Sequence, residues 1–158
     1  MDTQGALSPE ALEEAQAVYE AAGPTAQQVV RETAKAMAFD REEYRERVTS
    51  EVIERARNVL FAERLSVTVG SRAAFEEWRE AHPTYDVELQ GSDNVERLAW
   101  HSAPFAETVV AVTFQNEPEA AIGTVRRQAF GRIYRPRFED DAEASDGPGT
   151  ESENGGDE

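Results

Sequence analysis

The segment from Thr108 to Phe114 is the most apolar run in the chain, and it restricts the possible folds more than any other feature. Seven consecutive apolar or β-branched residues, Thr-Val-Val-Ala-Val-Thr-Phe, are typical of a strand covered on both faces. Such a strand needs neighbouring strands on both sides and further layers above and below it. We therefore expect the rest of the chain to be built around residues 108–114.

Three other segments also have the pattern of strands. Residues 65–69 and 85–89 alternate apolar and polar side chains, which predicts strands with one buried face. Residues 95–101 predict another strand. Its two faces carry Leu98 and Trp100 on one side, and Ala99 and His101 on the other. Short links join the last three predicted strands, so we expect them to form an antiparallel meander. A helix follows the first strand, starting after Gly70-Ser71 and ending at His82-Pro83.

The first 62 residues predict three helices. The first begins with Ser8 as its cap and Pro9 at its first position, and it ends at Gly23-Pro24. Pro24 then opens the second helix. Asp40 and Glu43 form a capping box that starts the third helix, which extends to about Ala62. The expected apolar stripe of this third helix consists of Tyr44, Val48, Val52, Ala56, Val59 and Leu60.

A last helix follows the central strand, with Asn116 as its predicted cap and Pro136 as its predicted end. The expected fold is α+β. Three N-terminal helices precede a four-stranded mixed or antiparallel sheet of order β-α-β-β-β, and a C-terminal helix completes it. Residues 1–137 are expected to form a single domain, and residues 138–158 a disordered acidic tail.

The charged residues are unevenly distributed along the chain, and the basic ones are almost all Arg. The chain has 32 acidic and 16 basic residues, and residues 139–158 hold nine acids, no base and no large apolar residue. The bases are fifteen Arg and one Lys, Lys35. This balance suits a cytoplasm of very high salt, where self-repulsion is screened. The absence of Cys excludes disulfides and Cys-based metal sites. No apolar run or leader indicates a membrane or secretion, so we expect a cytoplasmic protein without a membrane partner.

Four segments together are similar to a known protein family: residues 29–37, 39–44, 108–114 and 127–135. The chain from about Ser8 to Arg135 resembles an uncharacterised family of small acidic proteins of halophilic archaea, a domain of unknown function. The resemblance implies a salt-loaded cytoplasm. It implies no activity, ligand or catalytic residue.

No motif in the chain carries identifiable catalytic chemistry. His82 and His101 are the two histidines, and neither lies at a metal-ligand spacing such as HExxH, so we expect no metal and no cofactor. An enzyme would need a pocket, for which Arg97 and His101 with nearby carboxylates are the candidate residues. A non-enzymatic role is the stronger expectation.

Residues 126–137 hold five Arg and no acid in an otherwise acidic chain. The candidate binding surface consists of Arg127, Arg132, Tyr134, Arg135 and Arg137. Arg beside an aromatic residue suits phosphate and base contacts, which indicates RNA or another anion as ligand. The alternative is that these cations complement the end of a helix and pair with neighbouring carboxylates. In the RNA-binding interpretation, the acidic tail at residues 138–158 would compete with the ligand.

The function that the sequence favours is a protein-interaction domain that acts through a protein partner or as a homo-oligomer. Its expected surfaces are the N-terminal helices and the last helix. Nucleic-acid or anion binding at Arg126–Arg137 is the alternative. A wide exposed apolar patch would favour the first function, and Arg side chains converging free of acids would favour the second.

Overall fold

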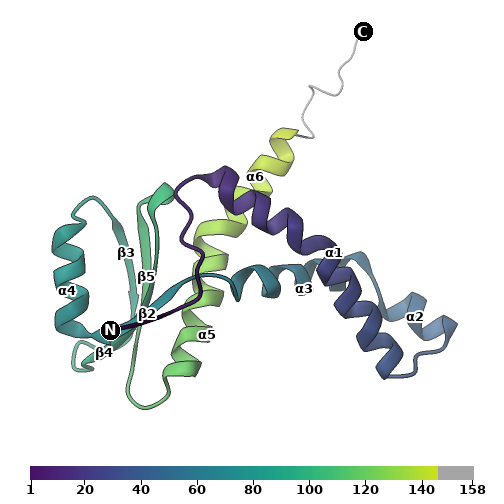
Figure 1. Ribbon diagram of the computed structural model, residues 1–158, viewed down its shortest axis with the longest axis horizontal. Coiled ribbons are helices and arrows are strands. Elements are labelled where there is room, and N and C mark those ends of the chain that lie inside the picture. Colours follow the sequence, from purple (N-terminus) through teal and green to yellow (C-terminus); the bar gives the residue numbers. More distant parts are fainter. Residues whose placement is uncertain (146–158) are drawn as a thin grey trace, which may run out of the picture.

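The computed structural model describes the backbone of residues 1–145 and the side chains of residues 1–140 (Figure 1). The elements in chain order are β1 (Asp2–Gln4), α1 (Leu12–Ala36), α2 (Arg41–Arg47), α3 (Ser50–Ala62), β2 (Val67–Ser71), α4 (Arg72–Ala81), β3 (Asp86–Gln90), β4 (Arg97–Ala103), a 3₁₀ turn η1 (Pro104–Ala106), β5 (Thr108–Phe114), α5 (Pro118–Ala129), a π-helix η2 (Phe130–Tyr134) and α6 (Arg135–Ser145).

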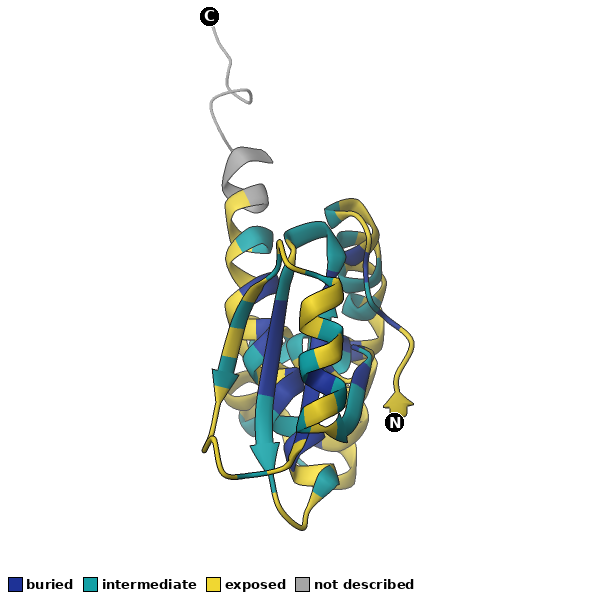
Figure 2. Ribbon diagram, turned by 90° about the vertical axis from the view of Figure 1, so that its left-hand side faces the viewer, coloured by how far each residue is buried: buried dark blue, intermediate teal, exposed yellow. Residues whose placement is uncertain are grey.

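The fold is α+β, as predicted, and its strands form one mixed sheet in the order β1-β2-β4-β5-β3. Helix α4 covers one face and α5 the other, while α1, α2 and α3 extend away from this body as an arm (Figure 1). On the α4 face, Phe75 packs with Leu98, Trp100, Val109 and Ala111. The central strands are dark blue in Figure 2, whereas the outer surface of α4 is yellow.

The face towards α5 carries the other half of the core. Val67 and Ala99 pack there with the buried side of α5, which consists of Ala121, Ile122 and Val125. The predicted alternation along β4 is thus confirmed, because Ala99 and Leu98 belong to different clusters. β5 is covered on both faces, as expected for the most apolar segment.

The predicted antiparallel meander is wrong. β4 pairs antiparallel with both β2 and β5, but β3 lies at the sheet edge and pairs parallel with β5. The burial of the strands explains this order. β4 buries both faces and takes a central place, whereas every second residue of β3 is exposed, which suits an edge.

The link from β3 to β4 therefore has to cross the end of β5. Gly91 makes this crossing with a φ of 124°. A Cβ at that position would lie 1.8 Å from Thr113 Oγ1, so no other residue fits without a rearrangement. Arg72, the first residue of α4, stabilises this link between β3 and β4. Its guanidinium donates to the carbonyl oxygens of Ser92 at 2.8 Å and Val95 at 3.0 Å.

The N-terminus differs from the prediction because its residues join the sheet. β1 adds a fifth strand by antiparallel pairing with β2, and the Arg126 guanidinium donates to the carbonyl oxygens of Gln4 and Leu65. Ser8 does not cap a helix, since its hydroxyl donates to the carbonyl oxygen of Ser102 at 2.9 Å. Helix α1 begins later, at Leu12.

The two predicted N-terminal helices are one continuous helix, α1, with Pro24 in its interior. A proline inside a helix removes one hydrogen bond and crowds the preceding turn. Helix α3 packs along α1 on both sides of this point. It contacts α1 at Tyr19, whose hydroxyl donates to Asn58 at 2.7 Å, and again beyond Pro24, where Val30 faces Val52. The packing of α3 therefore stabilises α1 across the hydrogen bond that Pro24 removes.

The predicted third helix is instead two helices. The capping box of Asp40 and Glu43 is confirmed, but α2 ends at Arg47 and α3 starts anew, with the Thr49 hydroxyl accepting from the backbone N–H of Val52 at 3.2 Å. The predicted apolar stripe is also wrong in part, because Val52 is 40% and Val59 61% exposed.

At the C-terminal end, Asn116 is not the cap of α5, whose N-cap is Glu117 without a side-chain hydrogen bond. The helix does not end at Pro136. The π-helix η2 precedes this proline, and the Arg137 side chain donates to the carbonyl oxygen of Ile133 at 2.7 Å. α6 continues to Ser145, so residues 138–145 of the predicted tail are helical. Residues 146–158 lie outside the described part.

Candidate docking groove on the helical arm

The arm ends in a tight turn that is set by Ala38. Met37 is the C-cap of α1, and Ala38 has a left-handed backbone with a φ of 56°. The N–H of Ala38 bonds the carbonyl of Lys35, and the N–H of Phe39 bonds the carbonyl of Ala34 at 3.2 Å. These two bonds define a Schellman motif, which brings the residue after the turn back against the last turn of the helix. The motif therefore aims Phe39 at Ala34.

Two further caps place the opposite wall. The capping box at Asp40 starts α2 immediately after Phe39, and Thr49 starts α3 two residues after α2 ends. The short helix α2 thereby turns the chain, so that α3 runs back along α1. Arg47, Val48 and Val52 face α1 as a result.

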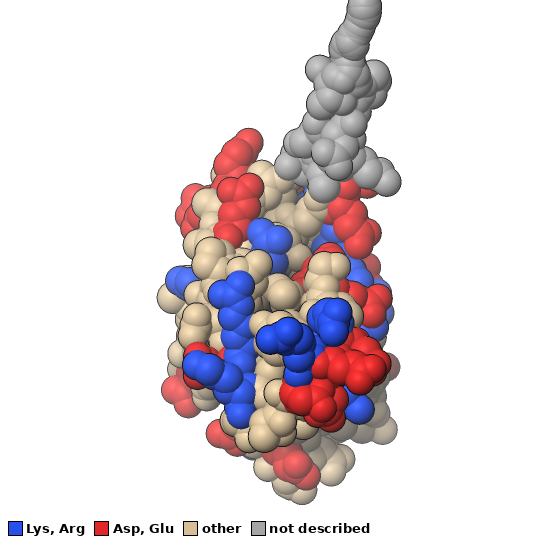
Figure 3. Space-filling model, turned by 90° about the vertical axis from the view of Figure 1, so that its right-hand side faces the viewer, with Lys and Arg blue, Asp and Glu red and all other residues tan. Residues whose placement is uncertain are grey.

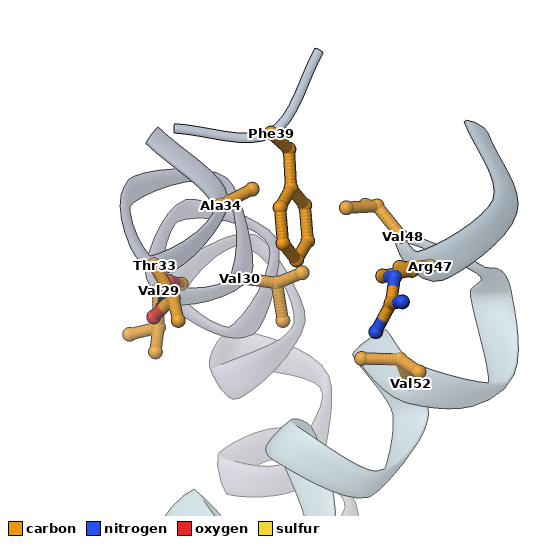
Figure 4. A pocket seen from close by; sticks show the side chains of 8 residues that line it. All are labelled: Val29, Val30, Thr33, Ala34, Phe39, Arg47, Val48 and Val52. Atoms are coloured by element: carbon orange, nitrogen blue, oxygen red, sulfur yellow. Dashed lines mark hydrogen bonds between the residues drawn. The ribbon is translucent and has the colours of Figure 1, made fainter. Parts of the chain in front are cut away.

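The two walls enclose an apolar hollow of about 430 Å³, which we call the arm groove. Its lining residues are Val29, Val30, Thr33, Ala34, Phe39, Arg47, Val48 and Val52. The Phe39 ring stands between the α1 side and the α2–α3 side, and its end approaches Val30 (Figure 4). Arg47 lies across from α1, with its guanidinium carbon 5.7 Å from the centre of the Phe39 ring. The volume is within the range of about 300–1,000 Å³ found for ligand pockets.

Exposed apolar side chains concentrate on this arm. Among the described residues, the large apolar side chains left exposed, apart from Met1, all belong to α1–α3 and their links: Val29, Met37, Tyr44, Val52 and Val59. Single exposed apolar residues are ordinary on protein surfaces, but exposed apolar residues that line a hollow favour an interaction site. Val29 and Val52 belong to both the exposed set and the groove lining.

The predicted Arg surface does not form one cluster. The Tyr134 side chain is fully buried, so it offers no stacking face. Arg132 forms an ion pair with Glu88 at 3.0 Å, and Arg135 forms one with Glu139 at 3.4 Å. The Arg127 guanidinium donates to the Thr124 hydroxyl.

The other two Arg of this segment also have protein partners. Arg137 lies over the Phe105 ring while it donates to the helix backbone. Arg126 is nearly buried and lies 3.6 Å from Glu63. These contacts follow the alternative interpretation, in which the cations serve the helix end and nearby carboxylates.

The predicted pocket at Arg97 and His101 does not form either. Arg97 covers the Phe114 ring at 4.6 Å, whereas His101 is buried four residues along the same strand. The Nδ1–H of His101 donates to the Ser66 carbonyl at 2.7 Å, and its Nε2 accepts from the Tyr134 hydroxyl at 2.7 Å. Both ring nitrogens thus have partners inside the protein.

Burial decides the charge state of this pair. Removal from water lowers the pKa of His101 to about 4, and the nearby Arg126 acts in the same direction. Burial also raises the pKa of Tyr134. Both groups are therefore neutral at pH 7 and have no access to solvent, which suits a structural link between β4 and η2.

His82, the second histidine, is the C-cap of α4. Its ring stacks on Trp78 with 4.2 Å between ring centres, and its Nδ1 lies 2.8 Å from the Trp78 carbonyl oxygen. Within residues 1–140, no three His, Asp or Glu side chains are grouped to hold a metal ion. No helix of the described chain combines the length and apolar character that crossing a membrane requires.

Part of the arm groove had a signal in the sequence. The apolar positions of α3 include Val52, Ile53, Ala56, Val59 and Leu60, and Val52 and Val59 among them stay exposed in the structure. The N-terminal helices were thus an expected surface. The groove itself was not predictable, because it depends on the turn at Ala38 and on the break between α2 and α3.

Comparison with known proteins places the chain in a family. Residues 6–135 match the model of a family of unknown function, DUF5809, and the chain therefore belongs to that family. No curated protein and no solved structure matches the chain.

Proposed function

We propose that this member of the DUF5809 family is a non-enzymatic protein-interaction domain whose docking site is the arm groove. The observation that carries the proposal is a preformed apolar hollow whose lining includes two exposed apolar side chains, Val29 and Val52. Burying such surface is the main driving force of protein association. The body supplies a rigid support, since the base of the arm packs in the core through Phe61 and Tyr19.

The kind of partner follows from the backbone of the groove walls. Both walls are helices, whose internal N–H and C=O groups already bond one another. They therefore offer no edge to which an extended peptide can add. A helix satisfies its own backbone and presents apolar side chains at positions i and i+3 or i+4, which fits a groove between two helices.

Site-specific photo-crosslinking tests this function. A crosslinking amino acid at Val52 should capture a discrete protein partner in extracts of the source cells at their own salt concentration. The same probe at Glu77, on α4, is the matched control on the body. The purified partner should then lose at least about tenfold in affinity on Val52→Asp, since a carboxylate in the groove must be desolvated. Capture that is equal from both positions, or insensitive to Val52→Asp, would contradict the proposal.

We also propose that the protein works in a salt-rich cytoplasm. The supporting observation is the net charge of −16 with fifteen Arg and one Lys. At 1 M salt the Debye length is about 3 Å, so repulsion among surface carboxylates is screened. The midpoint of thermal unfolding should rise from low to molar KCl. A midpoint that stays flat or falls would contradict this adaptation.

A further inference from the structure

The geometry points to an acidic amphipathic helix as the partner that occupies the arm groove. This inference rests on the proposed docking function and adds the charge of the partner. It comes from Arg47, the one charged residue that lines an otherwise mainly apolar hollow.

Arg47 has no carboxylate partner within the described residues. Ion pairs there involve Lys35, Arg55, Arg79, Arg126, Arg132 and Arg135. The guanidinium of Arg47 contacts the Phe39 ring instead. A guanidinium beside an apolar hollow is a strong partner for a carboxylate, because it can bind both oxygens at once.

Three more Arg lie in the same part of the chain as Arg47. Arg31, Arg41 and Arg45 also form no ion pair among the described residues, although the chain has twice as many acids as bases. Figure 3 shows Lys and Arg side chains on the face formed by the end of the arm, with Asp and Glu side chains beside them. Five of the sixteen bases lie between Arg31 and Arg47.

Several acids of the arm have intramolecular partners. Asp40 and Glu43 bond the backbone N–H groups of the capping box. Glu32 is near Lys35 and accepts from Gln28, and Glu51 is near Arg55. Glu42 and Glu46 on α2 and Glu54 on α3 have no such partner in the described part of the chain. Residues 31–47 hold five bases and five acids and are neutral in sum, so the positive charge at the groove is that of Arg47.

The charge of the arm groove favours some partners over others. A second copy of the chain, docked groove to groove, would bring Arg47 of one copy towards Arg47 of the other, and like charges across an interface are unfavourable. A partner with carboxylates beside its apolar anchors would pair with them. Molar salt screens exposed pairs strongly but screens partly buried pairs much less. Arg47 is exposed in the free protein, so its pair with a partner should weaken from low to molar KCl unless the partner covers it.

A display library of randomised 18-residue helical peptides tests the inference, with selection on the full-length protein at low and at molar KCl. Enriched peptides should carry two apolar residues at i and i+3 or i+4, flanked by Asp or Glu. Their binding should fall at least about tenfold on Val52→Asp and on Arg47→Glu. Arg79→Glu, a reversal of charge on the body, should leave it unchanged. Replacing the peptide acid by Arg should restore binding to the Arg47→Glu variant.

The outcomes separate the two proposals. Groove-dependent peptides that are neutral or basic would overturn the acidic partner and leave the docking function standing. Failure to obtain any peptide that depends on Val52 would overturn both. Competition by an RNA oligonucleotide for Arg47 would identify a nucleic acid as the ligand instead. A dimer in sedimentation that Val52→Asp abolishes would make a second copy the occupant, against the inference.

Discussion

β5 and the arm both contain many β-branched apolar residues, but they use them in opposite ways. In β5, Val109 and Val110 are buried between two layers of helix. On the arm, Val29 and Val52 remain exposed beside a hollow. A central strand has neighbours on every side, whereas the distal part of the arm is two helices packed on each other. The same residue type therefore stabilises the body and leaves the arm with a surface for a partner.

A carboxylate introduced into β5 and one introduced into the arm should give the largest difference in the free energy of unfolding. Val109→Asp places a carboxylate among Leu98, Trp100 and Phe75, with no cation to pair with it, and should cost more than about 4 kcal/mol and prevent folding. Val52→Asp, in the first turn of α3, should change the free energy of unfolding by less than about 1 kcal/mol. Urea denaturation followed by circular dichroism measures both. Equal losses would mean that the arm is part of the core.

The two regions also differ in their tyrosines. Tyr134→Phe leaves His101 Nε2 buried without a donor and should cost about 1–3 kcal/mol. The matched change on the arm, Tyr44→Phe, removes a hydroxyl that is exposed to water and should be within about 0.5 kcal/mol of the wild type. The comparison fails if the Tyr134 variant unfolds at the same urea concentration as the wild type.

His101 makes the body sensitive to pH. Its pKa is about 4 in the folded protein and about 6.5 when unfolded, so the unfolded chain binds more protons between these values. The contribution of this group is fully present above pH 6.5 and is lost as pH falls towards 4. Between pH 7 and pH 5 the loss should be about 2 kcal/mol. His101→Gln should reduce this pH dependence, and an unchanged slope would show that His101 is not the group responsible.

The smallest effect concerns the turn of the arm. Ala38→Gly should stabilise the protein by up to about 1 kcal/mol, because glycine adopts the left-handed conformation without the steric cost that alanine has. Ala17→Gly, at an exposed position inside α1, should destabilise it by about 0.5–1 kcal/mol. Thermal midpoints report both changes. Shifts of the same sign would contradict the turn geometry on which the groove depends.

These regions also differ in how well their sequences predict them. Four of the five strands, the capping box at Asp40 and the helix start after Ser71 depend on neighbouring residues, and the sequence predicts them. The parallel pairing of β3 with β5 depends on a link held by Arg72, which lies about twenty residues away in sequence. The continuity of α1 through Pro24 depends on packing against α3. Local patterns carry no information about such distant partners.

The candidate sites illustrate the same limit. Arg127, Arg132, Arg135 and Arg137 are close in sequence, and that closeness suggested a surface. Their partners, such as Glu88 for Arg132, come from elsewhere in the fold. The arm groove joins residues from Val29 to Val52 across two turns, and its signal was an excess of apolar residues on α3 without a stated neighbour.

The pairing of β1 with β2 has a consequence for protein synthesis. Residues 2–4 meet their strand partner about 65 residues later in the chain, and the guanidinium of Arg126 reaches Gln4 across 122 residues. On the ribosome, β1 therefore waits until Arg126 has been translated before its last contact can form. Nascent chains released before Arg126 would lack this contact between β1 and α5.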